Sequence, residues 1–233
     1  MTALRDRQRW QIEQGAPVGP QLHQILRQRI IRNDLEPGCR ISEAEIAADF
    51  LVSRQPVREA FIKLAEEGLL EIRPQRGTFV RKIEISSVMD ARFVREAIEA
   101  DIVKVLAAAA DKALLRELRA QISEQRRIAG RDSIRFIELD ERFHRTLAEA
   151  AGKSYAWSIV ESVKAQMDRV RHLSVQQFPM EKLVAQHAEV AEAIGAGEAA
   201  AAEAAMRGHL REILNDLPAV ARERPEFFET AGG

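Results

Sequence analysis

The sequence predicts a mainly α-helical chain: an N-terminal domain of three helices and a β-hairpin, followed by an all-α antiparallel bundle of about six helices. Three observations predict this fold class. Apolar residues recur at helical spacing over most of the 233 residues. Aromatic residues make up only 5% of a chain whose hydrophobic content is 46%, which favours helix formers such as Ala and Leu. One short segment, residues 69–80, is typical of two strands joined by a turn.

The charge distribution also divides the chain. Residues 1–82 carry 14 Lys and Arg against 11 Asp and Glu, a net charge of +3, and the remainder carries 21 against 25, a net charge of −4. A basic front part and an acidic back part indicate two domains with different partners. The expected divisions are a mobile N-terminal arm over 1–19, a first domain over 20–82, a linker over 83–87, a second domain over 88–217 and a C-terminal tail over 218–233.

Composition excludes several classes of protein. Cys39 is the single cysteine, which excludes an internal disulfide framework and a Cys-based zinc finger. No apolar run approaches the ~20 residues that a membrane-spanning helix needs. The N-terminus carries Arg5, Asp6 and Arg7 with no apolar segment behind them, which is not typical of a signal peptide. We therefore expect a cytoplasmic protein with no membrane association.

The first domain shows three helical segments and then the hairpin. An apolar stripe that begins at Leu22 ends in the turn residues 34–38. Ser42 opens a second helix with a capping box, and Ser53 caps a third helix that ends at Gly68. Three helices and a hairpin, in that order, are typical of a winged helix-turn-helix, in which the second helix of the pair enters the major groove of DNA.

The predicted recognition helix carries side chains suited to DNA. Arg54 and Arg58 are four residues apart, so both guanidinium groups project from one face. Arg can clamp a phosphate or bind a guanine edge with two hydrogen bonds, and Gln55 can pair with an adenine edge. A charge cluster alone would also fit a solvated face paired with Glu59 or Asp49, but the order of the elements favours DNA. The expected DNA-binding residues are Ser53, Arg54, Gln55 and Arg58 and, at the hairpin tip, Arg76 and Gly77.

Four separated blocks of the first domain occur in a family-specific order. They are Pro37-Gly38-x-x-Ile41, Ser53-Arg54-Gln55-Pro56-Val57-Arg58-Glu59-Ala60, Leu64-x-x-Glu67-Gly68-Leu69-Leu70 and Arg76-Gly77-Thr78-Phe79-Val80. Together they resemble the GntR family of bacterial transcription regulators. The resemblance implies binding to double-stranded operator DNA through Arg54 and Arg58. Two positions depart from the family pattern: Ala44 stands where some members have Arg, and Gln55 stands where Thr is common.

Polar residues fall on the apolar faces of the predicted bundle helices. Asp140 and His144 project within about 40° of each other on one helix, on its apolar side. His187 and His209 lie on the apolar faces of two later helices. Burying an unpaired carboxylate costs several kcal/mol, so these four residues should share a partner. Neutral imidazoles and one carboxylate suit a divalent metal ion, with zinc or nickel favoured.

The metal site competes with a simpler explanation. A lone buried histidine is more often hydrogen-bonded in a core than a metal ligand. That alternative would pair Asp140 with His144 and leave His187 and His209 bonded to backbone groups. Four residues that independently face inward favour the metal. By the same helical spacing, His172 is expected to face solvent and is excluded from the site.

The second domain also shows a resemblance. The blocks Arg95-x-x-x-Glu99, Asp140-x-x-x-His144, His187 and His209 resemble the FCD ligand-binding domain of the FadR branch of the GntR family, in its shorter VanR-like form. In metal-binding members these Asp and His positions hold the ion. Arg95 matches an arginine that faces the effector cavity, which implies a small organic-acid effector held between Arg and metal. An intrahelical ion pair between Arg95 and Glu99 is the alternative.

These features predict a homodimeric transcription regulator, a repressor, whose operator binding is controlled by an effector in a metal-containing domain. The alternative is a metal-dependent helical-bundle enzyme, because Glu141-x-x-His144 superficially matches a di-iron motif. Di-iron chemistry needs two such pairs and two further Glu. The sequence supplies one pair and shows no nucleophile–base arrangement. We therefore expect no enzyme activity.

Overall fold

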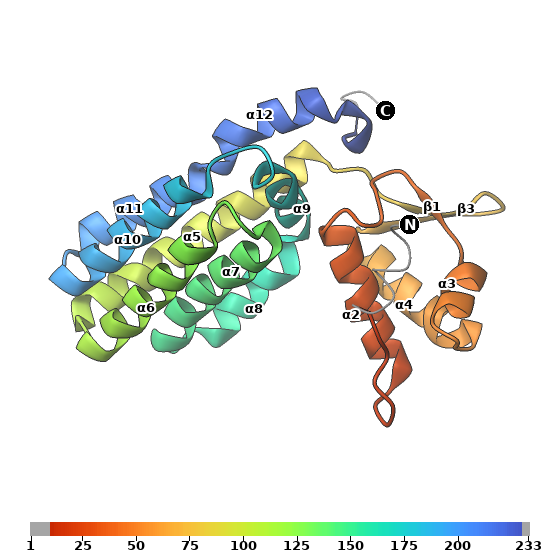
Figure 1. The fold of residues 1–233 in the computed structure, drawn as a ribbon, viewed down its shortest axis with the longest axis horizontal. Coiled ribbons are helices and arrows are strands. Elements are labelled where there is room, and N and C mark those ends of the chain that lie inside the picture. The colour runs from red at the N-terminus through yellow and green to blue at the C-terminus, as the bar shows by residue number, and fades with distance from the viewer. Residues whose placement is uncertain (1–9, 230–233) are drawn as a thin grey trace. The chain divides into compact units, whose positions relative to one another are not determined.

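The structure, a computed structural model, describes residues 10–229. The predicted arm over 1–19 and tail over 218–233 therefore lie partly outside the described residues. Contacts divide the chain into two compact units. The first runs to Ile83 and includes the C-terminal segment from Glu226, and the second is Glu84–Pro225. The mainly α fold class is confirmed: helices dominate the described residues, which also hold one small sheet (Figure 1).

The first unit contains the predicted three helices and hairpin. Its elements are α2 (Val18–Ile31), β1 (Arg40–Ile41), α3 (Glu43–Asp49), α4 (Arg54–Glu66), β2 (Leu70–Arg73) and β3 (Gly77–Val80). α2 packs against α4 through fully buried side chains that include Leu22, Leu26 and Phe61. Ser42 caps α3, since its hydroxyl accepts a hydrogen bond of 3.2 Å from the Ala44 amide. The apolar stripes read from the sequence thus form this core.

The sheet has three strands, one more than expected. The strand order is β1-β3-β2, and both pairings are antiparallel. Arg73 pairs with Gly77 next to the turn, and Arg40 on β1 pairs with Phe79. β1 has only two residues, which is too short for an alternating pattern to identify it from sequence. The added strand belongs to the connection between α2 and α3, and it pairs this connection with β3 of the hairpin.

The C-terminal segment returns to the first unit. The Ile83 amide donates to the Phe227 carbonyl at 2.8 Å, and the Glu229 amide donates to the Ile83 carbonyl at 3.0 Å. Ile83 and Phe228 form a parallel bridge, and Phe227 and Phe228 are both buried. The last described residues therefore complete the N-terminal unit. Ile83 stands just before the chain enters the second unit, and Phe227 and Glu229 stand just after it returns. These backbone hydrogen bonds therefore join the two segments of the first unit.

The second unit is a helical bundle. Its helices are α5 (Ile85–Ala109), α6 (Lys112–Ile128), α7 (Ser133–Ala150), α8 (Ser154–Val163), α9 (Ala165–Ser174), α10 (Met180–Ala196), α11 (Ala199–Arg211) and α12 (Ile213–Glu223), followed by the 3₁₀ turn Pro225–Phe227. Asp111 and Asp132 cap α6 and α7 by accepting from backbone amides. α5 is central, because it packs against α7, α8, α9, α10 and α11. No helix within the described part of the chain is both long and apolar enough to span a bilayer.

Two of the expected bundle helices are each broken once. Lys164 separates α8 from α9, and Glu212 separates α11 from α12, in each case without an intervening loop. The buried Lys164 ammonium donates to Asp168 at 2.6 Å on α9. α9 is buried on nearly all sides, so His172 is buried along with Val170 on the apolar side, and the expectation that His172 faces solvent was wrong. A helical wheel separates an apolar face from a polar face, and this distinction does not predict burial in a helix that is covered on nearly all sides.

Candidate DNA interface and metal centre

The exposed face of α4 presents the predicted arginine pair. The side chains of Arg54 and Arg58 are both more than half exposed, and both guanidinium groups contact Glu43 on α3. Arg54 Nη2 and Arg58 Nε each lie 3.3 Å from a Glu43 oxygen. Gln55, also exposed, donates to Glu59 at 2.9 Å. Glu43, which the sequence did not single out, thus holds the two arginines side by side.

The start of α4 offers further donors. Ser53 occupies the N-cap position, and its side chain makes no capping hydrogen bond. The first amides of a helix have no partner within that helix, so they can receive a phosphate oxygen. The Ser53 hydroxyl lies at the same place. The first amides of α4 and the Ser53 hydroxyl can thus bind an anion together, next to Arg54 and Arg58.

The hairpin tip carries Arg76 and Gly77 as expected. Gly77 has a φ of +108°, and a Cβ atom there would lie 2.7 Å from Arg40 Nε. This positive φ favours glycine, and the Arg40 side chain from β1 covers the position. The exposed Arg40 is therefore a further basic group beside Gly77. Arg40 gave no signal in the sequence, because a strand of two residues shows no alternating pattern.

The four predicted metal ligands lie together inside the second unit. Asp140 and His144 come from α7, His187 from α10 and His209 from α11. One ligand atom from each residue falls within 4.8 Å of all the others, and all four side chains are buried. His187 stacks on the Phe143 ring, with centroids 4.2 Å apart. Three separate helices thus bring the four groups to one point.

The imidazoles approach through their Nε2 atoms. His209 Nε2 lies 3.1 Å from His144 Nε2 and 3.2 Å from His187 Nε2. Asp140 joins this group, with an oxygen 3.5 Å from His187 Nε2. Ligands bound at ~2.1 Å to a single ion stand roughly 2.9 Å apart at right angles and roughly 3.4 Å apart at the tetrahedral angle. The observed separations suit one shared ion.

Each Nδ1 atom of the three histidines faces a side-chain oxygen. The pairs are His144 with Glu99 at 2.5 Å, His187 with Gln125 at 2.7 Å, and His209 with Gln186 at 3.1 Å. The Gln125 amide is oriented because its Nε2 donates to the Leu139 carbonyl at 3.1 Å. The Gln186 amide is oriented in the same way by Glu212, at 2.9 Å. Both glutamines therefore present an acceptor to the imidazole.

This orientation decides which ring nitrogens are available. A histidine that donates from Nδ1 keeps a lone pair on Nε2. Burial lowers the pKa of His187 to about 3 and lowers the pKa of His209 well below its usual value, so both rings are neutral. Neutral Nε2 atoms that face one another at hydrogen-bond distance have no proton to share. A cation bound between these nitrogens would be held by their lone pairs, so these residues fit a divalent metal.

Two buried arginines lie beside the cluster. Arg171 Nη2 contacts an Asp140 oxygen at 2.5 Å, and Arg95 Nε donates to Glu99 at 2.6 Å. Burial raises the pKa of Asp140, but the positive charge of the Arg171 guanidinium opposes this effect, and the pKa lies below its usual value. The alternative for Arg95, an ion pair with Glu99, is therefore present. Even so, Arg95 Nη2 and Arg171 Nε have no hydrogen-bond partner among the described residues.

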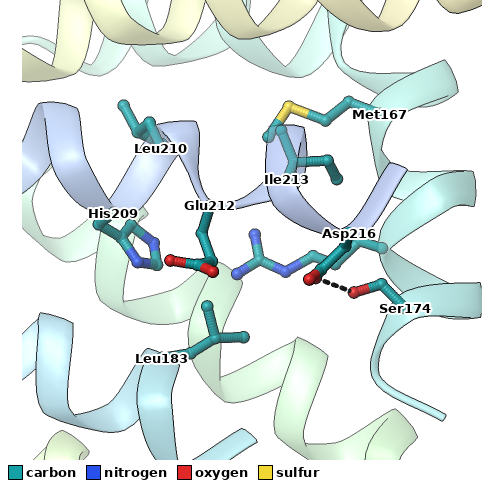
Figure 2. Close-up of a pocket in the computed structure, with 9 residues that line it drawn as sticks. Met167, Ser174, Leu183, His209, Leu210, Glu212, Ile213 and Asp216 are labelled. Atoms are coloured by element: carbon teal, nitrogen blue, oxygen red, sulfur yellow. Dashed lines mark hydrogen bonds between the residues drawn. The ribbon is translucent and has the colours of Figure 1, made fainter. Parts of the chain in front are cut away.

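A cavity opens next to His209. A space of about 30 Å³ is lined by His209, Arg171, Leu183 and Asp216, among others. A second cavity of about 260 Å³ shares Leu183 and Asp216 with it and is also lined by Lys182. Figure 2 shows the residues that line the smaller space, with Glu212 near His209 and with Asp216 accepting a hydrogen bond from Ser174. The smaller cavity thus reaches one member of the cluster, His209, and is lined by both polar and apolar side chains.

Comparison with known proteins identifies the family. Residues 20–80 match the model of bacterial regulatory proteins of the gntR family, and residues 90–212 match the FCD domain. The chain is 39% identical over 220 residues to the HTH-type transcriptional repressor RspR of Escherichia coli (strain K12), covering 94% of this chain and 96% of that protein. The chain belongs to the GntR family. This GntR protein carries the FCD domain of the FadR-type branch, as the sequence predicted.

Other relatives agree with this assignment. The GntR protein is 30% identical to the gluconate operon transcriptional repressor of Bacillus licheniformis, over 72% of this chain and 69% of that one. A solved GntR regulator from Rhodococcus sp. RHA1 superposes with a TM-score of 0.72 at 27% identity, covering 86% and 98% of the two chains. These relatives are transcriptional regulators and not enzymes. The GntR protein is accordingly a DNA-binding transcriptional regulator.

Proposed function

We propose that this regulator represses transcription by binding operator DNA as a homodimer in the cytoplasm, and that a small organic acid bound at a metal centre controls this binding. Repression is inferred from the two relatives that are named repressors. The proposed DNA contacts are Ser53, Arg54, Gln55, Arg58, Arg76 and Gly77. The observation that carries the effector control is the cluster of three facing imidazole nitrogens beside a cavity.

The proposed metal ligands are Asp140, His144, His187 and His209, with zinc or nickel as the ion. The set of three imidazoles and one carboxylate supports these borderline ions over magnesium or calcium, which prefer oxygen ligands. When bound, the ion supplies an electrophilic anchor for a carboxylate oxygen. The ion also joins α7, α10 and α11, so it stabilises the bundle around the cavity.

The effector is proposed to be a small carboxylate. Arg171 and Arg95 hold buried guanidinium nitrogens without partners beside the metal ligands, and a carboxylate is the group that a guanidinium binds best. An unpaired buried donor is costly, so a ligand that satisfies it binds more strongly. Arg95 is thus proposed to bind effector with the part of its guanidinium that Glu99 does not occupy.

The effector proposal predicts metal-dependent ligand stabilisation. In a thermal-shift screen of organic acids, at least one acid should raise the melting temperature of zinc-loaded protein by roughly 5 °C. The same acid should release a fluorescent operator duplex, and it should have no effect after treatment with EDTA. Arg171→Leu should abolish the shift, whereas Arg119→Leu, which removes an exposed arginine paired with Glu192, should retain it. A shift that is equal in metal-free protein would contradict the proposal.

An exposed apolar surface supports dimerisation. Ile85, Met89 and Phe93 follow one another at four-residue spacing on α5, and Tyr155 and Ile159 do so on α8. Phe93 is 66% exposed and Tyr155 81% exposed, and α5 and α8 pack against each other. Exposed apolar side chains that follow one face of a helix can mark interaction sites. A second copy is the proposed occupant, because a dimer is what a palindromic operator requires.

Charges placed on this surface should separate the dimer. The double change Phe93→Glu and Ile159→Glu is expected to give monomers by light scattering and to weaken operator binding at least tenfold, since one half-site is then bound at a time. Val105→Glu is the matched control: Val105 is also half exposed on α5 but lies about 120° around the helix from Phe93. Dimers that persist in the double variant would place the interface elsewhere.

A further inference from the structure

Leu51 stands out in the connection between α3 and α4. Its side chain is 92% exposed, the largest value among the described large apolar residues. Its φ is +55°, in the left-handed region that side chains avoid. Ile62 and Ile72 are about half exposed as well, but single exposed apolar residues in ordinary backbone are common. Leu51 combines full exposure with an unfavourable backbone.

The backbone around Leu51 explains why the position is strained. The Val52 amide donates to the Ala47 carbonyl at 3.0 Å, and the Leu51 amide donates to the Ala48 carbonyl at 3.3 Å. These two hydrogen bonds form the Schellman ending of α3, which places Leu51 where helices strongly prefer glycine. Packing could offset the strain of a leucine there, but this side chain contacts almost nothing within the described chain.

We propose that Leu51 binds the apolar surface of operator DNA, either a thymine methyl group or a deoxyribose, beside the contacts of Arg54 and Arg58. The inference rests on the proposed DNA-binding face. Leu51 lies two residues before Ser53, the N-cap residue of α4. Unpaired amides at this N-terminal end of α4 can receive a phosphate. The neighbouring side chains Arg54 and Arg58 are exposed cations, which favour a polyanion over another protein surface. Apolar contact with the thymine methyl is an established means of base readout.

Replacing Leu51 by glycine separates DNA binding from folding. Leu51→Gly relieves the backbone strain and removes the side chain together. The melting temperature of the full chain is therefore expected to stay level or rise by up to about 4 °C. Affinity for a duplex selected from a random pool by the wild-type protein is expected to fall about tenfold. Leu51→Met, which keeps an apolar side chain of similar length, should bind within about threefold of wild type.

A matched control comes from the second unit. Ala110 ends α5 with a φ of 43° and is exposed, so Ala110→Gly relieves the same kind of strain far along the chain from α4. This variant should melt at or above the wild-type temperature and bind the duplex with unchanged affinity. Arg58→Ala, measured in the same series, tests whether the exposed face of α4 binds DNA. If Arg58→Ala weakens binding and Leu51→Gly does not, only the inference about Leu51 fails.

Deoxyuridine substitution distinguishes the two apolar groups. A duplex in which one thymine is replaced by deoxyuridine lacks a single methyl group. If Leu51 contacts that methyl, the substitution weakens wild-type binding at one position and leaves Leu51→Gly unaffected. If it contacts a deoxyribose, no single substitution shows this difference, although Leu51→Gly still binds more weakly. Binding by Leu51→Gly that equals wild type, or a loss of affinity accompanied by a lower melting temperature, would overturn the proposal.

Discussion

Purified Asp140→Ala and His187→Ala variants are expected to contain little zinc or nickel, whereas the wild-type chain should hold about one ion. Loss of the ion should also remove its stabilisation of the fold. At a metal concentration ~1,000 times the dissociation constant this contribution is roughly 4 kcal/mol, or roughly 10 °C in melting temperature for a unit of this size. Elemental analysis and thermal melts of the same samples measure both effects.

The controls separate metal loss from damage to the core. After EDTA treatment, the wild-type protein should melt near the temperature of the variants, and only the wild type should regain stability when zinc is added. His172→Gln changes a buried histidine on α9 that lies outside the cluster, so it should keep the metal. Wild-type protein that carries no metal after growth in metal-rich medium, and gains no stability from zinc or nickel, would contradict the proposed centre.

Helical spacing predicted the cluster because its helices are regular. Asp140 and His144 lie on α7, His187 on α10 and His209 on α11, and each helix is continuous between its ligands and the apolar residues that precede them. A period of 3.6 residues therefore assigned the correct face to each. The same spacing failed for His172, because α9 is buried on nearly all sides and its polar side is therefore not exposed.

The residues that orient the cluster were harder to find. Gln125 follows Leu118 and Ile122 at seven- and three-residue spacing, which places it on the buried face of α6. That pattern is a usable signal, although glutamine is normally a surface residue. Arg171 gave no such signal, because α9 is buried on nearly all sides and burial there does not follow an apolar stripe. Glu43 gave no signal either, since an acidic residue in the first turn of a helix is already explained by its favourable interaction with the helix dipole.

The double change Arg54→Ala and Arg58→Ala is expected to weaken operator binding by roughly 100- to 1,000-fold, as each guanidinium can contribute a base or phosphate contact. Folding should be unaffected. Both side chains are largely exposed, and their ion pairs with Glu43 at 3.3 Å are of the surface kind that contributes little to stability. Fluorescence anisotropy with the selected duplex, together with thermal melts, measures affinity and folding.

The salt dependence of binding shows what each arginine does. A phosphate contact releases a counterion, so its loss lowers the slope of log affinity against log salt by about 1, whereas loss of a base contact relaxes specificity at one position. Arg119→Ala removes an exposed arginine of the second unit, which contacts Glu192 at 2.8 Å, and should change neither quantity. If the double variant binds the duplex as tightly as wild type, α4 is not the recognition helix. The DNA-binding face must then lie on another element of the N-terminal unit.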